Sequence, residues 1–317
     1  MNLPTTPHCW ILNAGSVGDT IASLPILKYA INNIFIDNKY KVMTHEHLRP
    51  LFQFIPEDNI IYFGKGVELT EPHVVLYYYN VEDPEYQGVS GFNNLKTSLV
   101  DYVSIKFLSK LLPEEHKNYP KLDLSDTDIS EFNLPEKYVC ISTTVLHKNR
   151  SIPKADIYRI ANYLLEQGII PIFMGKKVQI IDPNIPTPRC GISPPAKEGM
   201  LDLSDKTTLL QAAKIMDSAI AVVGADTGLI HLAACTDVPI ICGYTTVDPD
   251  LRMPYRHGIK GWNFHVITPP KTDCRYCASS MYLSNISFND CYQKEFQCID
   301  SLSAESYISI LKDIINA

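Results

Sequence analysis

One segment in the second half of the chain constrains the fold more than any other, because it alternates apolar runs with a turn and a helical pattern. The apolar run Ala219–Val223 predicts a buried strand, the turn Gly224–Gly228 follows at once, and Leu229–Ala234 has a helical pattern. A second apolar strand is predicted at Pro239–Cys242. A strand, turn, helix and strand in this order are typical of a parallel sheet covered by helices.

The turn inside this unit is suited to bind a phosphate group. A glycine-containing turn at a helix start points free backbone N–H groups and the positive end of the helix dipole toward one spot. The alternative is that Asp226 or Thr227 only caps the helix. His231 lies four residues after Thr227, so the two side chains share a helix face and His231 could donate to the same phosphate. The alternative for His231 is a structural role in the helix.

Composition and charge narrow the class of protein. The chain has 317 residues, enough for two domains, and it has the composition of an ordinary globular protein. No apolar run reaches the roughly 18 residues that a membrane span needs, and the N-terminus has no signal-peptide pattern. The net charge is −7, and the first 130 residues hold 10 basic and 16 acidic side chains. These features predict a cytoplasmic protein that binds no nucleic acid and has no membrane span, with peripheral membrane contact left open.

Strands alternate with helices in both halves, which predicts a parallel sheet in each. The Pro- and Asp-rich stretch 113–134 has little apolar periodicity and predicts a linker, in which Lys121–Leu124 could be a short strand. Pro25 predicts a kink or a restart of the first helix near Ser23. The remaining predicted strands are Cys9–Leu12, Lys41–Thr44, Ile60–Phe63, His73–Tyr79, Tyr138–Ser142 and Ile169–Met174, and the remaining helices are Thr20–Ile31, Lys154–Gln167, Leu209–Met216 and Leu302–Ile315.

The turn after the first predicted strand contains an acidic residue. The turn reads Gly-Ser-Val-Gly-Asp-Thr from Gly15 to Thr20, which has two glycines but not the full dinucleotide-binding pattern GxGxxG. Asp19 would lie at the carboxyl end of the sheet, where open α/β sheets bind ligands. Asp19 could therefore be a catalytic base, or it could be the N-cap of the helix.

Hydroxyl and cationic side chains follow the first strand of the second half. Thr143, Thr144 and Lys148 supply two hydroxyls and a cation near a strand end, a combination that suits a diphosphate. Arg150 could share or replace the role of Lys148. The alternative is a solvated loop with ordinary surface charge.

Four of the nine cysteines cluster near the C-terminus. Cys274 and Cys277 form a CxxC pair typical of a metal knuckle, whereas Cys291 and Cys298 are spaced more widely than in an ordinary zinc ribbon. Stable disulfides are not expected in a reducing cytoplasm. Two alternatives remain open. The cysteines hold a structural metal with no open position for catalysis, or they are unligated thiols.

The chain resembles glycosyltransferase family 9, the bacterial heptosyltransferases, in four segments that occur in the family's order. GSVGDTIASLP at 15–25 is similar to the family's N-terminal turn, and STTVLHK at 142–148 is similar to its phosphate loop. The segment 203–234, which ends in DTGLIHLAA, resembles the long signature of the C-terminal domain. GYTTVDP at 243–249 resembles the turn that follows. The resemblance covers nearly the whole chain, and its most specific part is the D-T-G-x-x-H-L-A run.

The resemblance implies an α/β fold of the GT-B type, in which two Rossmann-like domains with parallel sheets face each other across a cleft. The domain at 1–134 would bind the acceptor, and the domain at 135–300 would bind a nucleotide-sugar donor. The closing helix at 301–317 would either stay with the second domain or cross back to the first.

The resemblance also implies an inverting glycosyltransferase that uses a nucleotide sugar, usually ADP-heptose, and a glycan, lipopolysaccharide or protein acceptor. Asp19 would take the proton of the acceptor hydroxyl. The leaving diphosphate would be stabilised by Lys148 and the helix start, so catalysis would need no metal and no cofactor. The residues that would hold the donor are Thr143, Thr144, Lys148, Asp226, Thr227, Gly228 and His231. A structural zinc or iron would be held by Cys274, Cys277, Cys291 and Cys298.

Two features depart from the family pattern. Asp205 stands where the family usually has glycine, and the acidic first half would not attract the anionic inner core of lipopolysaccharide. The charge favours a protein or a less charged glycan as the acceptor. The rival functions are a non-catalytic scaffold that binds nucleotide sugars and a GT-B sugar-nucleotide epimerase. Asp19 together with the donor signature argues against the scaffold, and the epimerases differ from this chain around the first turn.

Overall fold

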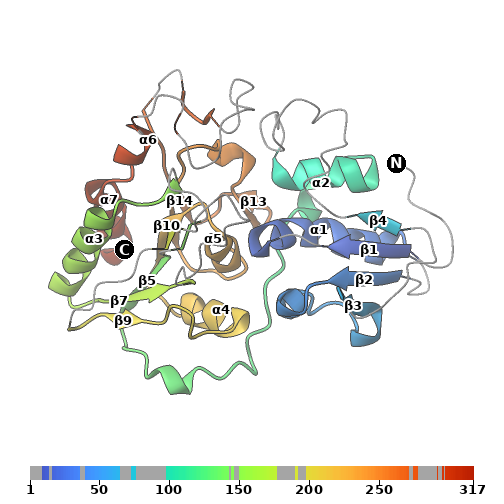
Figure 1. Ribbon diagram of the computed structural model, residues 1–317, viewed down its shortest axis with the longest axis horizontal. Helices are drawn as coiled ribbons and strands as arrows, with labels where there is room; N and C mark the ends of the chain where they lie inside the picture. The colour runs from blue at the N-terminus through green and yellow to red at the C-terminus, as the bar shows by residue number, and fades with distance from the viewer. Residues whose placement is uncertain are drawn as a thin grey trace.

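Two parallel β-sheets, one in each half of the chain, form the framework of the protein in this computed structural model (Figure 1). The expected α/β architecture is therefore confirmed. The structure describes residues 9–13, 16–35, 40–64, 73–75, 98–142, 144–145, 150–176, 190–191, 198–270, 274–277, 291, 295 and 297–317.

The first sheet has the strand order β3-β2-β1-β4, and all its pairings are parallel. Its strands are β1 (Cys9–Asn13), β2 (Tyr40–Thr44), β3 (Ile60–Tyr62) and β4 (His73–Val75). Helix α1 (Val17–Asn33) follows β1, and α2 (Leu99–Leu108) packs against α1. Short 3₁₀ helices in this half and in the connector are η2 (Glu46–Leu51), η3 (Glu57–Asn59), η4 (Glu114–His116) and η5 (Ser130–Phe132).

The second sheet has the order β14-β11-β10-β5-β7-β9, and it is also parallel throughout. Its strands are β5 (Tyr138–Ser142), β7 (Ile170–Met174), β9 (Leu201–Asp202), β10 (Val222–Ala225), β11 (Ile240–Gly243) and β14 (Phe264–Ile267). The helices of this half are α3 (Lys154–Glu166), α4 (Leu209–Asp217), α5 (Gly228–Ala233), α6 (Gln297–Asp300), α7 (Ala304–Ile315) and the 3₁₀ helix η7 (Pro249–Leu251). Two short antiparallel pairs lie outside the sheet, β6 (Thr144–Val145) with β8 (Cys190–Gly191) and β12 (Tyr255–Arg256) with β13 (Ile259–Lys260).

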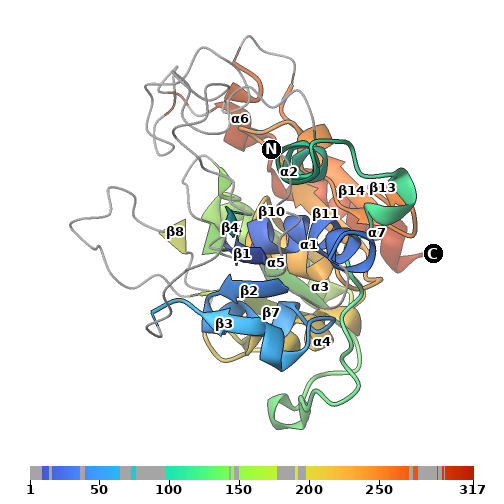
Figure 2. The same cartoon turned by 90° about the vertical axis from the view of Figure 1, so that its right-hand side faces the viewer.

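Alternate residues of the second sheet face two apolar cores, as the two-residue period of a strand requires. Val139 and Ile141 of β5 lie in the cluster beneath α3 and α7. Tyr138 and Cys140 lie in the cluster on the side of α4 and α5. This second cluster continues through α5 into α1 and the first sheet, and the two helices lie side by side (Figures 1 and 2). A continuous apolar core therefore joins the two halves.

Most predicted elements are confirmed to within a few residues. The exception in the key segment is β10, which begins at Val222 and includes Gly224 and Ala225, two residues expected in the turn. Helix α1 runs without interruption through Pro25, so the expected restart near Ser23 is wrong. In the described connector, Lys121–Leu124 forms no strand.

The closing helix α7 packs against α3 and β14 of the second half (Figure 1). Tyr307 Oη donates a hydrogen bond to Gly224 O at 3.0 Å, which ties α7 to the end of β10. The helix therefore stays with the second sheet and does not cross back to the first. None of the helices in the described part of the chain has the length and apolar character needed to cross a membrane.

Candidate functional site

The first turns of α1 and α5 are in direct contact, and two glycines make the contact close. A Cβ placed on Gly18 would lie 2.9 Å from His231 Cδ2 and 3.6 Å from Gly228 Cα. A Cβ placed on Gly228 would lie 3.2 Å from Val17 Cβ. Because glycine has no side chain, the turn after β1 and the turn after β10 approach each other backbone to backbone. The two glycine turns singled out in the sequence thus meet at one site.

Asp19 is the third residue of α1 and lies next to this contact. Ser16 precedes the helix, its Oγ donates to Asp19 Oδ2 at 2.8 Å, and its backbone N–H donates to the same oxygen at 3.4 Å. Asp19 is therefore not the N-cap, which is Ser16, but the acidic partner in a capping box. Both bonds use Oδ2, so Oδ1 stays outside the capping interaction.

Asp226 is a buried carboxylate surrounded by positively charged and imidazole groups. Arg150 Nη1 lies 3.0 Å from Asp226 Oδ2, and His231 Nε2 lies 3.7 Å from Oδ1. Burial alone would raise the pKa of Asp226. Contact with His231 and the positive charges of Arg150 and Arg252 outweigh burial and hold the pKa well below its ordinary value. Asp226 is therefore ionised throughout the physiological pH range.

His231 is buried and has a partner from the connector between the halves. Its Nδ1 lies 3.1 Å from the hydroxyl oxygen of Tyr119. Burial raises the pKa of Tyr119 far above its ordinary value, and the carboxylates of Asp226 and Asp19 add to this rise. Both carboxylates therefore act electrostatically on one phenol.

Thr227 occupies the N-cap position of α5, but its side chain does not cap the described helix. Its Oγ1 lies 3.3 Å from Ser142 Oγ at the end of β5, so two hydroxyls from neighbouring strand ends come together. Thr227 therefore makes no side-chain hydrogen bond to the described residues of α5 that would cap the helix. Ser142 was not among the predicted site residues, although it ends a buried strand at the edge where such sheets bind ligands.

Two predicted donor residues, Thr143 and Lys148, lie outside the described residues. Thr144 lies in β6, where it pairs with Gly191 of β8, and only its backbone is described. Arg150 is described and its guanidinium contacts Asp226, whereas its sharing of the role of Lys148 stays a prediction.

The four C-terminal cysteines lie within electrostatic range of one another. Burial raises the pKa of the Cys298 thiol to about 12, and the thiols of Cys277, Cys291 and Cys274 contribute to the rise. Among the described residues, however, no group of three or more His, Cys, Asp or Glu side chains is arranged to hold a metal ion. The predicted metal site therefore stays a prediction.

The fold and the site define the class of protein. Two parallel sheets with helices at their carboxyl edges, joined where two helix starts meet, are the architecture of the GT-B type. Four of the predicted site residues, Asp226, Gly228, His231 and Asp19, lie at or beside this junction.

Comparison with known proteins identifies the family. The profile of glycosyltransferase family 9 (heptosyltransferase) matches residues 89–275, which is more than half of the chain. The chain belongs to glycosyltransferase family 9, and the prediction of a heptosyltransferase-like glycosyltransferase is confirmed at that level. A comparison with curated protein sequences gives no match.

The solved structures that are similar to this chain include heptosyltransferases. The iron-containing dodecameric glycosyltransferase TibC from enterotoxigenic E. coli H10407 is similar with a TM-score of 0.72 and 15% identity, over 100% of this chain and 78% of that one. TibC in complex with ADP-D-β-D-heptose gives a TM-score of 0.70 and 14% identity, with the same coverage. The E. coli ADP-heptose lipopolysaccharide heptosyltransferase II gives a TM-score of 0.58 and 18% sequence identity, over 93% of this chain and 98% of that one.

Proposed function

We propose that this protein transfers a heptose from ADP-heptose to an acceptor hydroxyl with inversion at the sugar carbon. The observation that carries the proposal is the contact between Gly18 and His231, which places Asp19 beside the family's donor signature. A base and a phosphate-holding turn at one site are what a single-displacement sugar transfer requires.

On the donor side, the diphosphate would meet Thr227, Gly228 and His231, while the ionised Asp226 would hold the Arg150 guanidinium in position. Helix α5 has only six residues, so its dipole supplies a limited part of the stabilisation. Positively charged side chains would supply a larger part of the stabilisation of the diphosphate. Arg150 and Arg252 both act on Asp226, which neutralises part of their charge and fixes the position of Arg150. In the proposed mechanism, Thr143, Thr144 and Lys148 add two hydroxyls and a further cation from the loop after β5.

On the acceptor side, Asp19 would act as the general base. As the sugar carbon gains oxocarbenium character, the acceptor hydroxyl must lose its proton to a carboxylate within hydrogen-bond reach. Ser16 holds Asp19 through Oδ2, so Oδ1 is the oxygen that would receive the proton. The negative charge that develops on the leaving diphosphate would be met by cationic side chains, so the mechanism requires no catalytic metal.

The charge of the first half of the chain indicates which class of acceptor the protein would bind. The first 130 residues are acidic on balance, with 16 acidic against 10 basic side chains. Such a surface repels a heavily phosphorylated glycan at long range. A protein or a weakly charged glycan is therefore the proposed acceptor, reached in the cytoplasm.

The donor set of the C-terminal cysteines fits a structural metal. Four thiols with a CxxC pair match the preferences of zinc and iron, and the thiols lie within electrostatic range of one another. Cys274, Cys277, Cys291 and Cys298 would hold the metal, which would stabilise this part of the chain. Four thiolates leave no open coordination position, so the metal would take no part in sugar transfer.

ADP release tests the proposed function directly. Purified protein is incubated with ADP-heptose, with and without candidate protein and glycan acceptors, and ADP is quantified against matched UDP- and GDP-sugars. Acceptor-dependent ADP release supports the proposal. Binding of ADP-heptose without release, even with acceptors, would favour the non-catalytic scaffold, and a shift of the thermal midpoint by UDP or GDP compounds alone would exclude the ADP donor.

A further inference from the structure

A buried tyrosine from the connector between the two halves contacts the histidine of the donor signature. Tyr119 Oη and His231 Nδ1 are 3.1 Å apart, although the residues are 112 positions apart in the sequence. Both side chains are buried. The contact joins the connector to helix α5, and Tyr119 lies outside the segment 203–234 that resembles the family's C-terminal signature.

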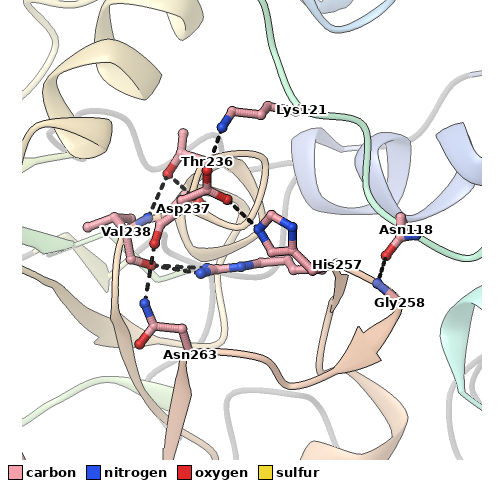
Figure 3. Close-up of polar contacts among 10 residues, drawn as sticks. Asn118, Lys121, Thr236, Asp237, Val238, His257, Gly258 and Asn263 are labelled. Atoms are coloured by element: carbon pink, nitrogen blue, oxygen red, sulfur yellow. Dashed lines mark hydrogen bonds and ion pairs between the residues drawn. The ribbon is translucent and has the colours of Figure 1, made fainter.

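The connector around Tyr119 is fixed on both sides by polar contacts to the second half (Figure 3). Asn118 Oδ1 accepts a hydrogen bond from the backbone N–H of Gly258 at 2.6 Å. Two residues after Tyr119, the Lys121 ammonium pairs with the carboxylate of Asp237. These contacts attach the connector to the second half on both sides of Tyr119.

Backbone hydrogen bonds reinforce this position. The Tyr119 N–H donates to Tyr255 O at 2.9 Å, and the Leu122 N–H donates to Cys235 O at 3.3 Å. Cys235 follows directly on α5, the helix that carries His231. The connector is thus attached to the end of the helix as well as to its histidine.

The other two sides of the imidazole ring are also occupied. Gly18 of α1 lies against Cδ2, and Asp226 Oδ1 lies 3.7 Å from Nε2. Because the negative charge of Asp226 attracts an N–H group and repels a nitrogen lone pair, the ring nitrogen that faces Asp226 is the one that carries the proton. Nδ1 then has a free lone pair. Burial keeps the Tyr119 hydroxyl protonated, because it raises the pKa of the phenol, so the hydroxyl can donate to that lone pair.

We propose that Tyr119 is a positioning residue that fixes the orientation of His231 and its Nε2–H tautomer, so that Nε2 donates to the donor diphosphate. The separation of 3.7 Å from Asp226 exceeds a hydrogen bond, so the Nε2 proton is available to an incoming phosphate oxygen. This inference rests on the proposed function for the identity of the ligand. The tautomer itself does not depend on that identity.

The variant Tyr119→Phe removes only the hydroxyl. A matched control is Tyr138→Phe, which removes the buried hydroxyl that donates to Ile215 O at 2.9 Å. The tautomer of His231 is read from the ¹⁵N shifts of its two ring nitrogens in labelled protein, with the signals assigned through His231→Gln. Wild type and Tyr138→Phe should show His231 protonated at Nε2 alone, and Tyr119→Phe should show a mixture of both tautomers. A wild-type Nδ1–H tautomer, or an unchanged tautomer in Tyr119→Phe, overturns the proposal.

Binding of ADP, measured by calorimetry, gives the second readout. Tyr119→Phe should weaken ADP binding by about three- to tenfold, the effect of one neutral hydrogen bond, whereas Tyr138→Phe should stay within about twofold of wild type. Equal losses in both variants would show a merely structural effect and overturn the positioning role. If wild type binds no ADP, the proposed donor fails, and the ring-nitrogen shifts alone decide whether Tyr119 sets the tautomer.

Discussion

Gly18 lies so close to His231 that a methyl group in place of its hydrogen would come within 2.9 Å of the imidazole carbon Cδ2. The two residues belong to helices that follow strands of different sheets, α1 after β1 and α5 after β10, and they are more than 200 positions apart in the sequence. Their contact brings a carboxylate of the first half, Asp19, close to the turn of the second half that was predicted to bind a phosphate. The chemistry of the site therefore depends on how closely two helix starts approach each other.

The variant Asp19→Asn tests the proposed base. Asparagine keeps the size of the side chain and can still accept from Ser16, but it cannot take a proton from the acceptor. Turnover should fall by about 100- to 10,000-fold, while ADP binding stays within about twofold of wild type. The measurements are steady-state ADP release and calorimetry with ADP. A variant that keeps a tenth or more of wild-type turnover would exclude Asp19 as the base.

The variant Gly18→Ala tests the close approach of the two turns. The added methyl would displace the His231 ring, and a displacement of about 1 Å at such a site can reduce turnover about 100-fold. Alanine favours the helix by about 1 kcal/mol over glycine, so the fold should persist. Thermal unfolding and ADP release are measured beside Lys28→Ala, an exposed position on the same helix. Full activity of Gly18→Ala would show that the turns can separate without loss.

The variant Asp226→Asn tests the buried ion pair. It leaves the partly buried Arg150 guanidinium without its carboxylate, which should lower the free energy of unfolding by about 2 to 4 kcal/mol. Urea unfolding measures the loss. Asp237→Asn is the control, because its pair with Lys121 is exposed and should contribute about 1 kcal/mol or less. Equal losses in the two variants would contradict the assignment of Asp226 as the buried partner.

The elements that the sequence predicts well are those whose apolar residues follow a single period. Strand β5 was predicted with its observed bounds, and α3 ends within one residue of its prediction. Helix α2 and strand β14 are among the elements that were not predicted. Helix α2 is rich in Val, Ile and Phe and has no clear polar face, and β14 has only four residues. In both cases the element is fixed by what it packs against, which a local pattern does not contain.

The site was predictable only where residues are close in sequence. The turn at Gly228 and the histidine at position 231 form one local motif, so residue spacing was enough to find them. Tyr119 gave no signal, because nothing in a Pro- and Asp-rich linker indicates that one phenol reaches a histidine 112 residues away. Arg150 was named only as an alternative to Lys148, and its partner Asp226 became visible only in the structure.

The ion pair of Asp226 also predicts a pH dependence. The folded-state pKa of Asp226 is lowered, so its contribution to stability is fully present above the ordinary aspartate value of about 4 and is lost as the pH falls below it. The difference in unfolding free energy between wild type and Asp226→Asn should be constant from about pH 5 to pH 8. Below about pH 4 it should shrink by about 1.4 kcal/mol per pH unit. Urea unfolding at each pH checks this, and a difference that grows in acid would reverse the sign of the assigned shift.

The packing of α7 and the preceding Leu302 against the second sheet predicts a substitution that should affect stability alone. A methyl group at Gly243, the last residue of β11, would overlap the side chains of Leu302 and Tyr307, which are both fully buried. Displacing Tyr307 would also weaken the hydrogen bond that its hydroxyl donates to Gly224 O. Gly243→Ala should therefore lower the free energy of unfolding by about 1 to 3 kcal/mol or more, measured by urea unfolding.

Gly64→Ala separates steric overlap from backbone strain. Gly64 has a φ of +83° and nothing within 4 Å of an added methyl, so its replacement should destabilise by about 1 kcal/mol through the backbone alone. Gly243 does not have a positive φ, so its larger expected loss comes from crowding. In a Gly243→Ala background, Leu302→Ala should then destabilise less than it does in wild type, because the smaller side chain makes room for the methyl. Additive losses in the double variant would mean that Leu302 does not pack against Gly243 of β11.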